Sequence, residues 1–169
     1  MSLDVAKKCV DFLANNIKKS NKDSGRLTFF GGEPTLMWDE IIVPIAKYVK
    51  EFYPDLIHLG ITTNGTLLNK ERIDFMYKYN IRPHLSCDGD EYVQNINRPC
   101  RDLNQKSFDL LKRNIPYLLY RFPYTTMRAT IYQNTVDEVF NSYLFAISNN
   151  FKSFYITPNC REKWTDENI

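Results

Sequence analysis

Apolar residues along this chain follow two alternating spacings. Between Val5 and Lys18 they recur every three or four positions, which is the spacing of one buried helix face. Residues 27–30 are instead a short β-branched and aromatic run, Leu-Thr-Phe-Phe, which is typical of a buried strand. The two spacings alternate as far as residue 157, so helix and strand are predicted to alternate along the whole chain.

The pattern predicts a helix before each of five strands. Helices are expected over 5–18, 39–52, 70–79, 108–119 and 135–149, with a flaw at Pro44, an interruption near Pro116 and a cap at Thr135. Strands are expected over 27–30, 56–62, 82–87, 124–131 and 152–157, and a long polar loop over 90–105. Strands joined through helices lie parallel and cross over with right-handed connections. This α/β pattern fits an open doubly wound sheet or an arc of a β/α barrel, and periodicity alone does not choose between them.

Composition indicates a soluble globular protein of one domain. The 169 residues are 43% hydrophobic and 25% charged, which is ordinary for such a chain. The net charge of +2 is too small to indicate a nucleic-acid or anionic-membrane partner. No apolar run approaches the roughly 20 residues that span a bilayer, and the N-terminus lacks the apolar core of a signal peptide. A cytoplasmic location is therefore predicted.

The four cysteines are predicted to be free thiols. Cys9, Cys87, Cys100 and Cys160 are widely and irregularly spaced, and no two of them form a C-x-x-C pair. A disulfide scaffold is unexpected in a chain of this length without a secretion signal. The spacing predicts no metal site within these residues.

The stretch Gly31-Gly32-Glu33-Pro34 is a candidate ligand loop. It follows the predicted strand 27–30, and glycines without Cβ atoms let a ligand approach main-chain groups. Pro34 fixes its own φ and restricts Glu33 to extended geometry, which holds the carboxylate near the end of the strand. Folds of this class place their ligands at that end of the sheet. The alternative reading is an ordinary tight turn between a strand and a helix.

The other predicted strands also carry polar groups at or near their ends. These are Thr62-Thr63-Asn64-Gly65-Thr66, then Ser86-Cys87-Asp88-Gly89 with Asn97-Arg98-Pro99 in the loop beyond, then Arg128-Ala129-Thr130, then Tyr155-Ile156-Thr157-Pro158. In this order and spacing the series resembles the radical S-adenosylmethionine (radical SAM) enzymes. The nearest branch contains the anaerobic sulfatase-maturating enzymes and the peptide-modifying maturases, and the resemblance covers residues 27 to 158.

The resemblance implies a partial β/α barrel, usually of six strands, with the sulfonium cofactor across the carboxyl ends of the strands. It implies that Gly31, Gly32 and Glu33 border the amino group of the cofactor, where strand-end carbonyls and a carboxylate would accept hydrogen bonds from an ammonium. Ser86 and Arg98 match positions that hold the amino and carboxylate groups of its methionine part. Guanidinium suits the second task because it grips a carboxylate bidentately.

Further residues belong to the predicted cofactor-binding set. Ile156 matches a position that borders the adenine through its backbone or side chain, and Pro34, Asn64, Asp88 and Arg128 complete the set. No catalytic residue is assigned.

Simpler readings of these residues remain open. Arg98 could be a solvated loop arginine, Ser86 an ordinary strand-end hydroxyl, and Arg128 a surface strand residue. Asn64-Gly65 could be turn chemistry alone, and Asp88 could cap its own loop.

The branch pattern and this chain differ between Gly89 and Asn97. The usual pattern reads approximately Pro-x-Glu-x-His-Asp, whereas residues 90–96 here are Asp-Glu-Tyr-Val-Gln-Asn-Ile. The loop length is kept and the polar residues are changed. The resemblance therefore points to the branch and not to sulfatase maturation in particular.

The cysteine triplet C-x-x-x-C-x-x-C of the family is absent from the sequence. In the family it follows the first strand and ligates a [4Fe–4S] cluster. Reduction of the cofactor by that cluster gives methionine and a 5′-deoxyadenosyl radical, which abstracts a substrate hydrogen. The resemblance implies a peptide or protein side chain as substrate, and an electron donor such as flavodoxin or ferredoxin.

The chain begins with a predicted helix, although this architecture normally begins with a strand. One truncation would explain both this start and the missing cysteine triplet. We therefore expect residues 1–169 to be a single truncated domain, five strands of an expected six, in which residues 1–3 look like a cloning remnant. Such a piece is expected to be inactive alone. It is also expected either to self-associate through the exposed edge of strand 27–30 or to cover that edge with its N-terminal helix.

Two rival functions are considered. The first is a degenerate, non-catalytic barrel that serves as a peptide- or protein-binding module, which the loop 90–105 and the many tyrosines would suit. The second is an unrelated α/β enzyme acting on a sugar or phosphate, but no G-x-G-x-x-G or Walker loop is present. His58 and His84 fall within predicted strands and are expected to be structural.

Overall fold

A computed structural model describes residues 1–102 and 104–165 of the chain. Its helices are α1 (Leu3–Lys19), α2 (Val43–Phe52), α3 (Lys70–Lys78), α4 (Glu91–Asn97), α5 (Ser107–Lys112), α6 (Ile115–Arg121) and α7 (Val139–Ser148). Its strands are β1 (Gly25–Phe29), β2 (Ile57–Thr63), β3 (Arg82–Ser86), β4 (Thr126–Ile131) and β5 (Ser153–Pro158). Three short helical turns, η1 (Pro34–Met37), η2 (Trp38–Ile42) and η3 (Gln133–Glu138), complete the elements.

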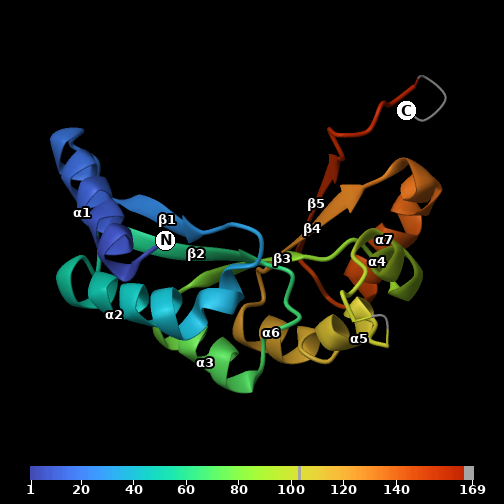
Figure 1. The fold of residues 1–169 in the computed structure, drawn as a ribbon, viewed down its shortest axis with the longest axis horizontal. Helices are drawn as coiled ribbons and strands as arrows, with labels where there is room; N and C mark the ends of the chain where they lie inside the picture. The colour runs from blue at the N-terminus through green and yellow to red at the C-terminus, as the bar shows by residue number, and fades with distance from the viewer. Residues whose placement is uncertain (103, 166–169) are drawn as a thin grey trace. The chain divides into compact units, whose positions relative to one another are not determined.

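The strands form one five-stranded sheet in the order β1-β2-β3-β4-β5. The pairs β1–β2, β3–β4 and β4–β5 are all parallel, as connections through helices require. The predicted α/β fold with parallel strands is therefore confirmed (Figure 1). The chain divides into two compact units, and each is described by itself below. Unit 1 comprises Met1–Thr63 and Glu71–Pro83, and unit 2 comprises Asn64–Lys70 and His84–Ile169.

Unit 1 is built from α1 and α2 against β1 and β2. Helix α1 begins after Ser2, whose hydroxyl accepts a hydrogen bond from the Val5 amide. Its apolar face packs inward against α2 and β1, and Val10 and Ala14 on that face are almost fully buried. Ile45 of α2 and Ile61 of β2 are equally buried in the same unit.

Unit 2 contains β4, β5 and the helices α4 to α7. Its buried core includes Leu85, Leu111, Ile115, Leu118 and Met127. Gly65, with φ of +74°, turns the chain where a Cβ atom would lie 2.7 Å from the Cδ1 atoms of both Leu85 and Leu111. Packing therefore requires glycine at this turn.

Two local predictions are wrong, and two that concern prolines are confirmed. The predicted loop 90–105 contains α4 over Glu91–Asn97, and its residue 103 lies outside the described residues. The predicted interruption of helix 108–119 is present, because the chain breaks at Asn114 and Pro116 stands in the first turn of α6. Pro44 likewise stands in the first turn of α2, which begins at Val43, so the predicted helix 39–52 is shortened. Thr135 does not cap a helix: it lies within η3 in a non-helical conformation, and α7 begins at Val139.

None of the helices in the described part of the chain combines the length and the apolar composition that crossing a membrane needs.

Candidate functional site

The Gly-Gly-Glu-Pro loop of unit 1 fixes the carboxylate of Glu33 at the end of β1. Glu33 is the N-cap of η1, and its Oε1 accepts hydrogen bonds from the Thr35 amide at 3.0 Å and the Thr35 hydroxyl at 2.5 Å. The Thr63 hydroxyl at the end of β2 donates to the same oxygen at 2.7 Å. Pro34 starts the turn at the position where its missing N–H has no cost. Two adjacent strand ends therefore orient one carboxylate.

The two glycines before Glu33 are not required by internal packing. A methyl group added to Gly31 or Gly32 would meet no atom within 4 Å, which is the opposite of the crowding at Gly65. Gly31 also has φ of +157°, a conformation that side chains disfavour, whereas Gly32 shows no such restriction. The space beside this backbone is open, as a main-chain binding surface needs.

A cavity of about 420 Å³ opens beside this loop within unit 1. Gly31, Gly32 and Glu33 lie along it, and Ile41, Ile42 and Ile45 give it an apolar wall. Helix α1 contributes Ala6 and Cys9 on the other side. Its volume is in the range of small-molecule sites, with an apolar wall and a few polar groups at the loop.

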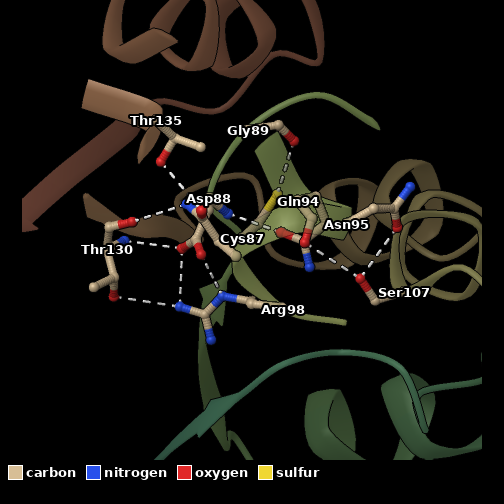
Figure 2. A network of polar contacts seen from close by, with 10 residues as sticks. Cys87, Asp88, Gly89, Gln94, Asn95, Arg98, Ser107, Thr130 and Thr135 are labelled. Atoms are coloured by element: carbon tan, nitrogen blue, oxygen red, sulfur yellow. Dashed lines mark hydrogen bonds and ion pairs between the residues drawn. The ribbon is translucent and has the colours of Figure 1, made fainter. Parts of the chain in front are cut away.

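In unit 2, Asp88 and Arg98 form a partly buried ion pair (Figure 2). Arg98 Nε and Nη2 donate to the two carboxylate oxygens of Asp88 at 2.8 and 2.9 Å. The Thr130 amide also donates to Asp88 at 2.8 Å, and the Thr130 hydroxyl lies 3.4 Å from Arg98 Nη2. The side chain of Asp88 is 0% exposed and that of Arg98 is 28% exposed. The pair ties the end of α4 to β4.

The remaining groups of Figure 2 support this ion pair. Gln94 Oε1 accepts a hydrogen bond from the Asp88 amide at 2.9 Å. Asn97 donates to the Thr130 carbonyl and accepts from the Thr135 hydroxyl, so both residues at the end of α4 contact the segment around β4. The Cys87 thiol is fully buried within the network, and burial raises its pKa to about 12. It is therefore a protonated packing residue at neutral pH.

The structure places the other predicted residues of unit 2 as follows. The Asn64 Oδ1 accepts from the amide and hydroxyl of Thr66, which is an Asx turn. Ser86 at the end of β3 is in register with Arg128 on β4. Ile156 lines a small cavity with Ala129 and Val139, so its side chain faces the helices. Only the backbone of Ile156 is then available to the opposite face of the sheet.

Sequence reasoning named Glu33, Asp88 and Arg98 but not their partners. It expected Arg98 to bind a ligand and did not pair it with Asp88. The partners carry no pattern of their own: Thr63 and Thr130 lie in strands, where threonine is common, and Thr35 lies in the turn η1. A signal was available for Arg98, since Asp88, Asp90 and Glu91 all precede it within ten residues of the sequence.

The cysteines of this chain do not fit an iron–sulfur cluster. Cys9 lies on α1, Cys87 is buried in unit 2, Cys100 follows α4, and Cys160 is exposed after β5. Among the described residues, no group of three or more His, Cys, Asp or Glu side chains is placed to hold a metal ion. No step is therefore assigned to a cluster on these residues. The open glycine loop, in contrast, fits an organic cofactor that needs main-chain acceptors.

Comparison with known proteins gives one family. The model of the Radical SAM superfamily matches residues 10–146. An uncharacterized protein of Methanocaldococcus jannaschii is 28% identical over 168 residues, which cover 98% of this chain and 56% of that protein. A cysteine-type anaerobic sulfatase-maturating enzyme of Clostridium novyi is 28% identical over 134 residues, 77% of this chain and 35% of the enzyme.

A solved structure shares the fold. It is anSMEcpe with bound AdoMet and a Cp18Cys peptide, with a TM-score of 0.72 and 22% identity over 86% of this chain and 41% of that one. The chain thus spans between about a third and a little over half of the length of these proteins.

Proposed function

This chain belongs to the radical SAM superfamily, and we propose that it carries part of the binding site for S-adenosylmethionine. The observation that carries the proposal is the open Gly31-Gly32 backbone beside an oriented Glu33 carboxylate. The amino group of the cofactor is a cation with three N–H donors, and strand-end carbonyls together with this carboxylate are the acceptors that it needs. The apolar wall of the adjoining cavity suits the uncharged parts of such a ligand.

The remaining predicted contacts belong to the same proposal. Ser86 would bind the methionine part through its hydroxyl, and the backbone at Ile156 would border the adenine. Asn64, Asp88 and Arg98 would act by holding the loops that follow β2 and β3, because each makes hydrogen bonds to protein groups.

For the whole protein, we propose the chemistry of its family. S-adenosylmethionine supplies a 5′-deoxyadenosyl radical, which abstracts a hydrogen atom from the substrate. A peptide or protein side chain is the proposed substrate, because one relative matures sulfatases and anSMEcpe was solved with a peptide. Cluster ligands from outside these 169 residues and a flavodoxin or ferredoxin as electron donor remain predictions.

The glycine loop provides a sharp test through Gly32→Ala. Because the added methyl group meets no protein atom, the free energy of unfolding should change by less than about 0.5 kcal/mol. Because the same group would occupy the ligand's approach, binding of S-adenosylmethionine, followed by ligand-observed NMR at millimolar concentration, should weaken about tenfold or more. Gly65→Ala is the matched control, since it should lower stability through its clash with Leu85 and Leu111.

Three results would contradict these assignments. Wild-type protein that shows no S-adenosylmethionine binding at millimolar ligand, or a Gly32→Ala variant that binds as well as wild type, would remove the proposed site. Anaerobic reconstitution with iron and sulfide should give no stoichiometric cluster on this chain. A stable cluster would contradict the conclusion that its cysteines do not fit one.

A further inference from the structure

Three strands of unit 2 present a row of polar side chains on one face of the sheet. Ser86 of β3 is in register with Arg128 of β4, and Arg128 is in register with Tyr155 of β5. Adjacent strands lie about 5 Å apart, so Arg128 has one neighbour on each side at that spacing. Met127 and Ala129 alternate with Arg128 and are buried, which directs Arg128 to the face opposite the helices.

Arg98, the other arginine near this face, already has its counter-charge. Two of its nitrogens donate to Asp88, and one of them also reaches the Thr130 hydroxyl. A ligand carboxylate that took Asp88's place would leave a fully buried carboxylate without a partner. That exchange is costly, so Arg98 is better described as a positioning residue than as the ligand's cation.

Arg128 is different because its side chain has no acidic partner. Within residues 1–102 and 104–165 its guanidinium makes no hydrogen bond or ion pair, and the contact that it does make is with an aromatic ring. Its guanidinium carbon lies 5.4 Å from the centroid of the Tyr155 ring. The ring orients the guanidinium without neutralising it, and cation–π contacts of this kind contribute about 0.5–1 kcal/mol at exposed sites. A half-buried cation is thus held in place with its hydrogen-bond donors unused.

We propose that Arg128, flanked by Ser86 and stacked on Tyr155, binds a carboxylate of the ligand. A guanidinium donates two parallel hydrogen bonds to a carboxylate, and the Ser86 hydroxyl can supply a third donor. The neighbouring positions in register, Thr126, Thr130 and Ser153, add hydroxyl groups and no charge. One free cation among hydroxyls matches a singly charged carboxylate better than a doubly charged phosphate.

This inference rests on the proposed function, which offers two sources of that carboxylate. One is the methionine carboxylate of S-adenosylmethionine, and the other is an acidic side chain or the C-terminus of a peptide substrate. In either case the assignment moves the ligand's cation from Arg98, as the sequence suggests, to Arg128.

The first experiment follows the Nε–H signal of Arg128 by NMR during titration with acetate, and with acetamide as the neutral control. The signal is assigned by its loss in Arg128→Gln. Acetate should shift it saturably and acetamide should not. Tyr155→Leu should weaken the acetate effect about two- to fivefold, whereas Tyr155→Phe, which keeps the ring, should not. Arg26→Gln, at an exposed arginine of β1, is the control for general charge loss.

The second experiment identifies the source by comparing S-adenosylmethionine with its decarboxylated analogue. If wild type prefers the carboxylated form about tenfold or more and Arg128→Gln abolishes that preference, the source is the cofactor. The alternative result is that Arg128→Gln still prefers S-adenosylmethionine over its decarboxylated analogue but no longer binds an acidic peptide more tightly than the amide form of that peptide. In that case the source is the substrate.

Failure of the inference is distinct from failure of the proposed function. An Arg128 signal that does not respond to acetate, or a carboxylate preference that Arg98→Lys abolishes and Arg128→Gln does not, overturns the inference whether or not the cofactor binds. A normal acetate response in a protein that binds no S-adenosylmethionine overturns only the proposed function.

Discussion

At the scale of single residues, Asp88 connects three parts of unit 2. It follows β3, receives two hydrogen bonds from Arg98 at the end of α4, and receives one from the Thr130 amide in β4. Its own amide donates to Gln94. A carboxylate with this many donors can be excluded from water because each of its oxygens is satisfied. The residue that the sequence offered as a ligand contact is therefore central to the local fold.

Asp88→Asn should destabilise the protein by about 3 kcal/mol, because it leaves Arg98 half-buried without its counter-charge. The measurement is the free energy of unfolding from urea titration. Glu91→Gln is the control, since it breaks an ion pair with Lys106 that lies exposed at the surface and is screened by salt. Equal stability of Asp88→Asn and wild type would show that the pair contributes nothing to the fold.

The buried thiol of Cys87 makes a second residue-scale prediction. With its pKa raised by burial from 9.0 to about 12, its thiolate fraction near pH 8 is lower by a factor of about 10³ than that of an ordinary cysteine. Iodoacetamide should therefore label Cys9 and Cys160 in the native protein and spare Cys87 until the protein is denatured. Mass spectrometry of the peptides reads the result directly.

The same pKa predicts how stability depends on pH. A group whose folded pKa lies above its unfolded value stabilises the fold below the unfolded pKa and loses that effect as the pH rises through the folded one. Cys87 should contribute fully below pH 9 and progressively less up to about pH 12. A Cys87→Ala variant should show a shallower loss of stability over that range. Native labelling of Cys87 as fast as Cys9 would contradict both expectations.

At the scale of elements, a hydrogen-bonded cluster joins α1 to α2 in unit 1. The hydroxyls of Tyr48 and Tyr53 both donate to Asp11 Oδ1 at 2.8 Å. The hydrogen bond to Asp11 is the main reason that the pKa of Tyr48 rises to about 12. Lys7 and Lys18 also lie over the two rings. One acid therefore anchors the end of α2 to the middle of α1.

Removal of this acid by Asp11→Ala should loosen α1. The expected result is a lower urea midpoint, together with faster amide exchange in α1, followed by hydrogen exchange with mass spectrometry. Asp4→Ala is the control on the same helix, since Asp4 forms an ion pair with Lys8 in which both side chains are more than 75% exposed. Equal exchange rates in the two variants would mean that the cluster does not hold the helix.

The sequence predicts an element well when the spacing of its apolar residues is regular. Helix α1 and all five strands are found within a few residues, because their apolar spacing is regular. Helix α4 is missed because it has only seven residues and two of its three apolar side chains are exposed or nearly so. The sequence does contain the N-cap of α4, because aspartate is a favoured cap residue and Asp90 accepts a hydrogen bond from the Val93 amide in the structure. For the site, the sequence indicates which polar residues lie at strand ends. It does not indicate their hydrogen-bond partners, because residues distant in the sequence are brought together only by the fold.

At the scale of the whole molecule, β1 stands at one end of the strand order. Helix α1 and β1 both line the cavity of about 420 Å³, so the helix flanks the strand without filling the space beside it. Edge strands with free backbone groups are templates for pairing with another chain. Self-association through this edge therefore remains our prediction.

Sedimentation velocity should show association that increases with protein concentration, and Leu27→Lys in β1 should reduce it by placing a charge in the edge strand. Phe12→Lys is the matched control, because Phe12 is 70% exposed on α1 and does not line the cavity. A wild-type protein that stays monomeric at all concentrations would contradict the prediction.

The division into two units has a consequence for dissecting the protein. The backbone passes from one unit to the other at residues 63–64, returns at 70–71 and leaves again at 83–84. Neither unit is a continuous stretch of polypeptide. A cut after Pro83 keeps all of unit 1 in one fragment, but that fragment also carries residues 64–70 of unit 2. Unit 2 alone would have to be made by joining residues 64–70 to residue 84 with a new linker.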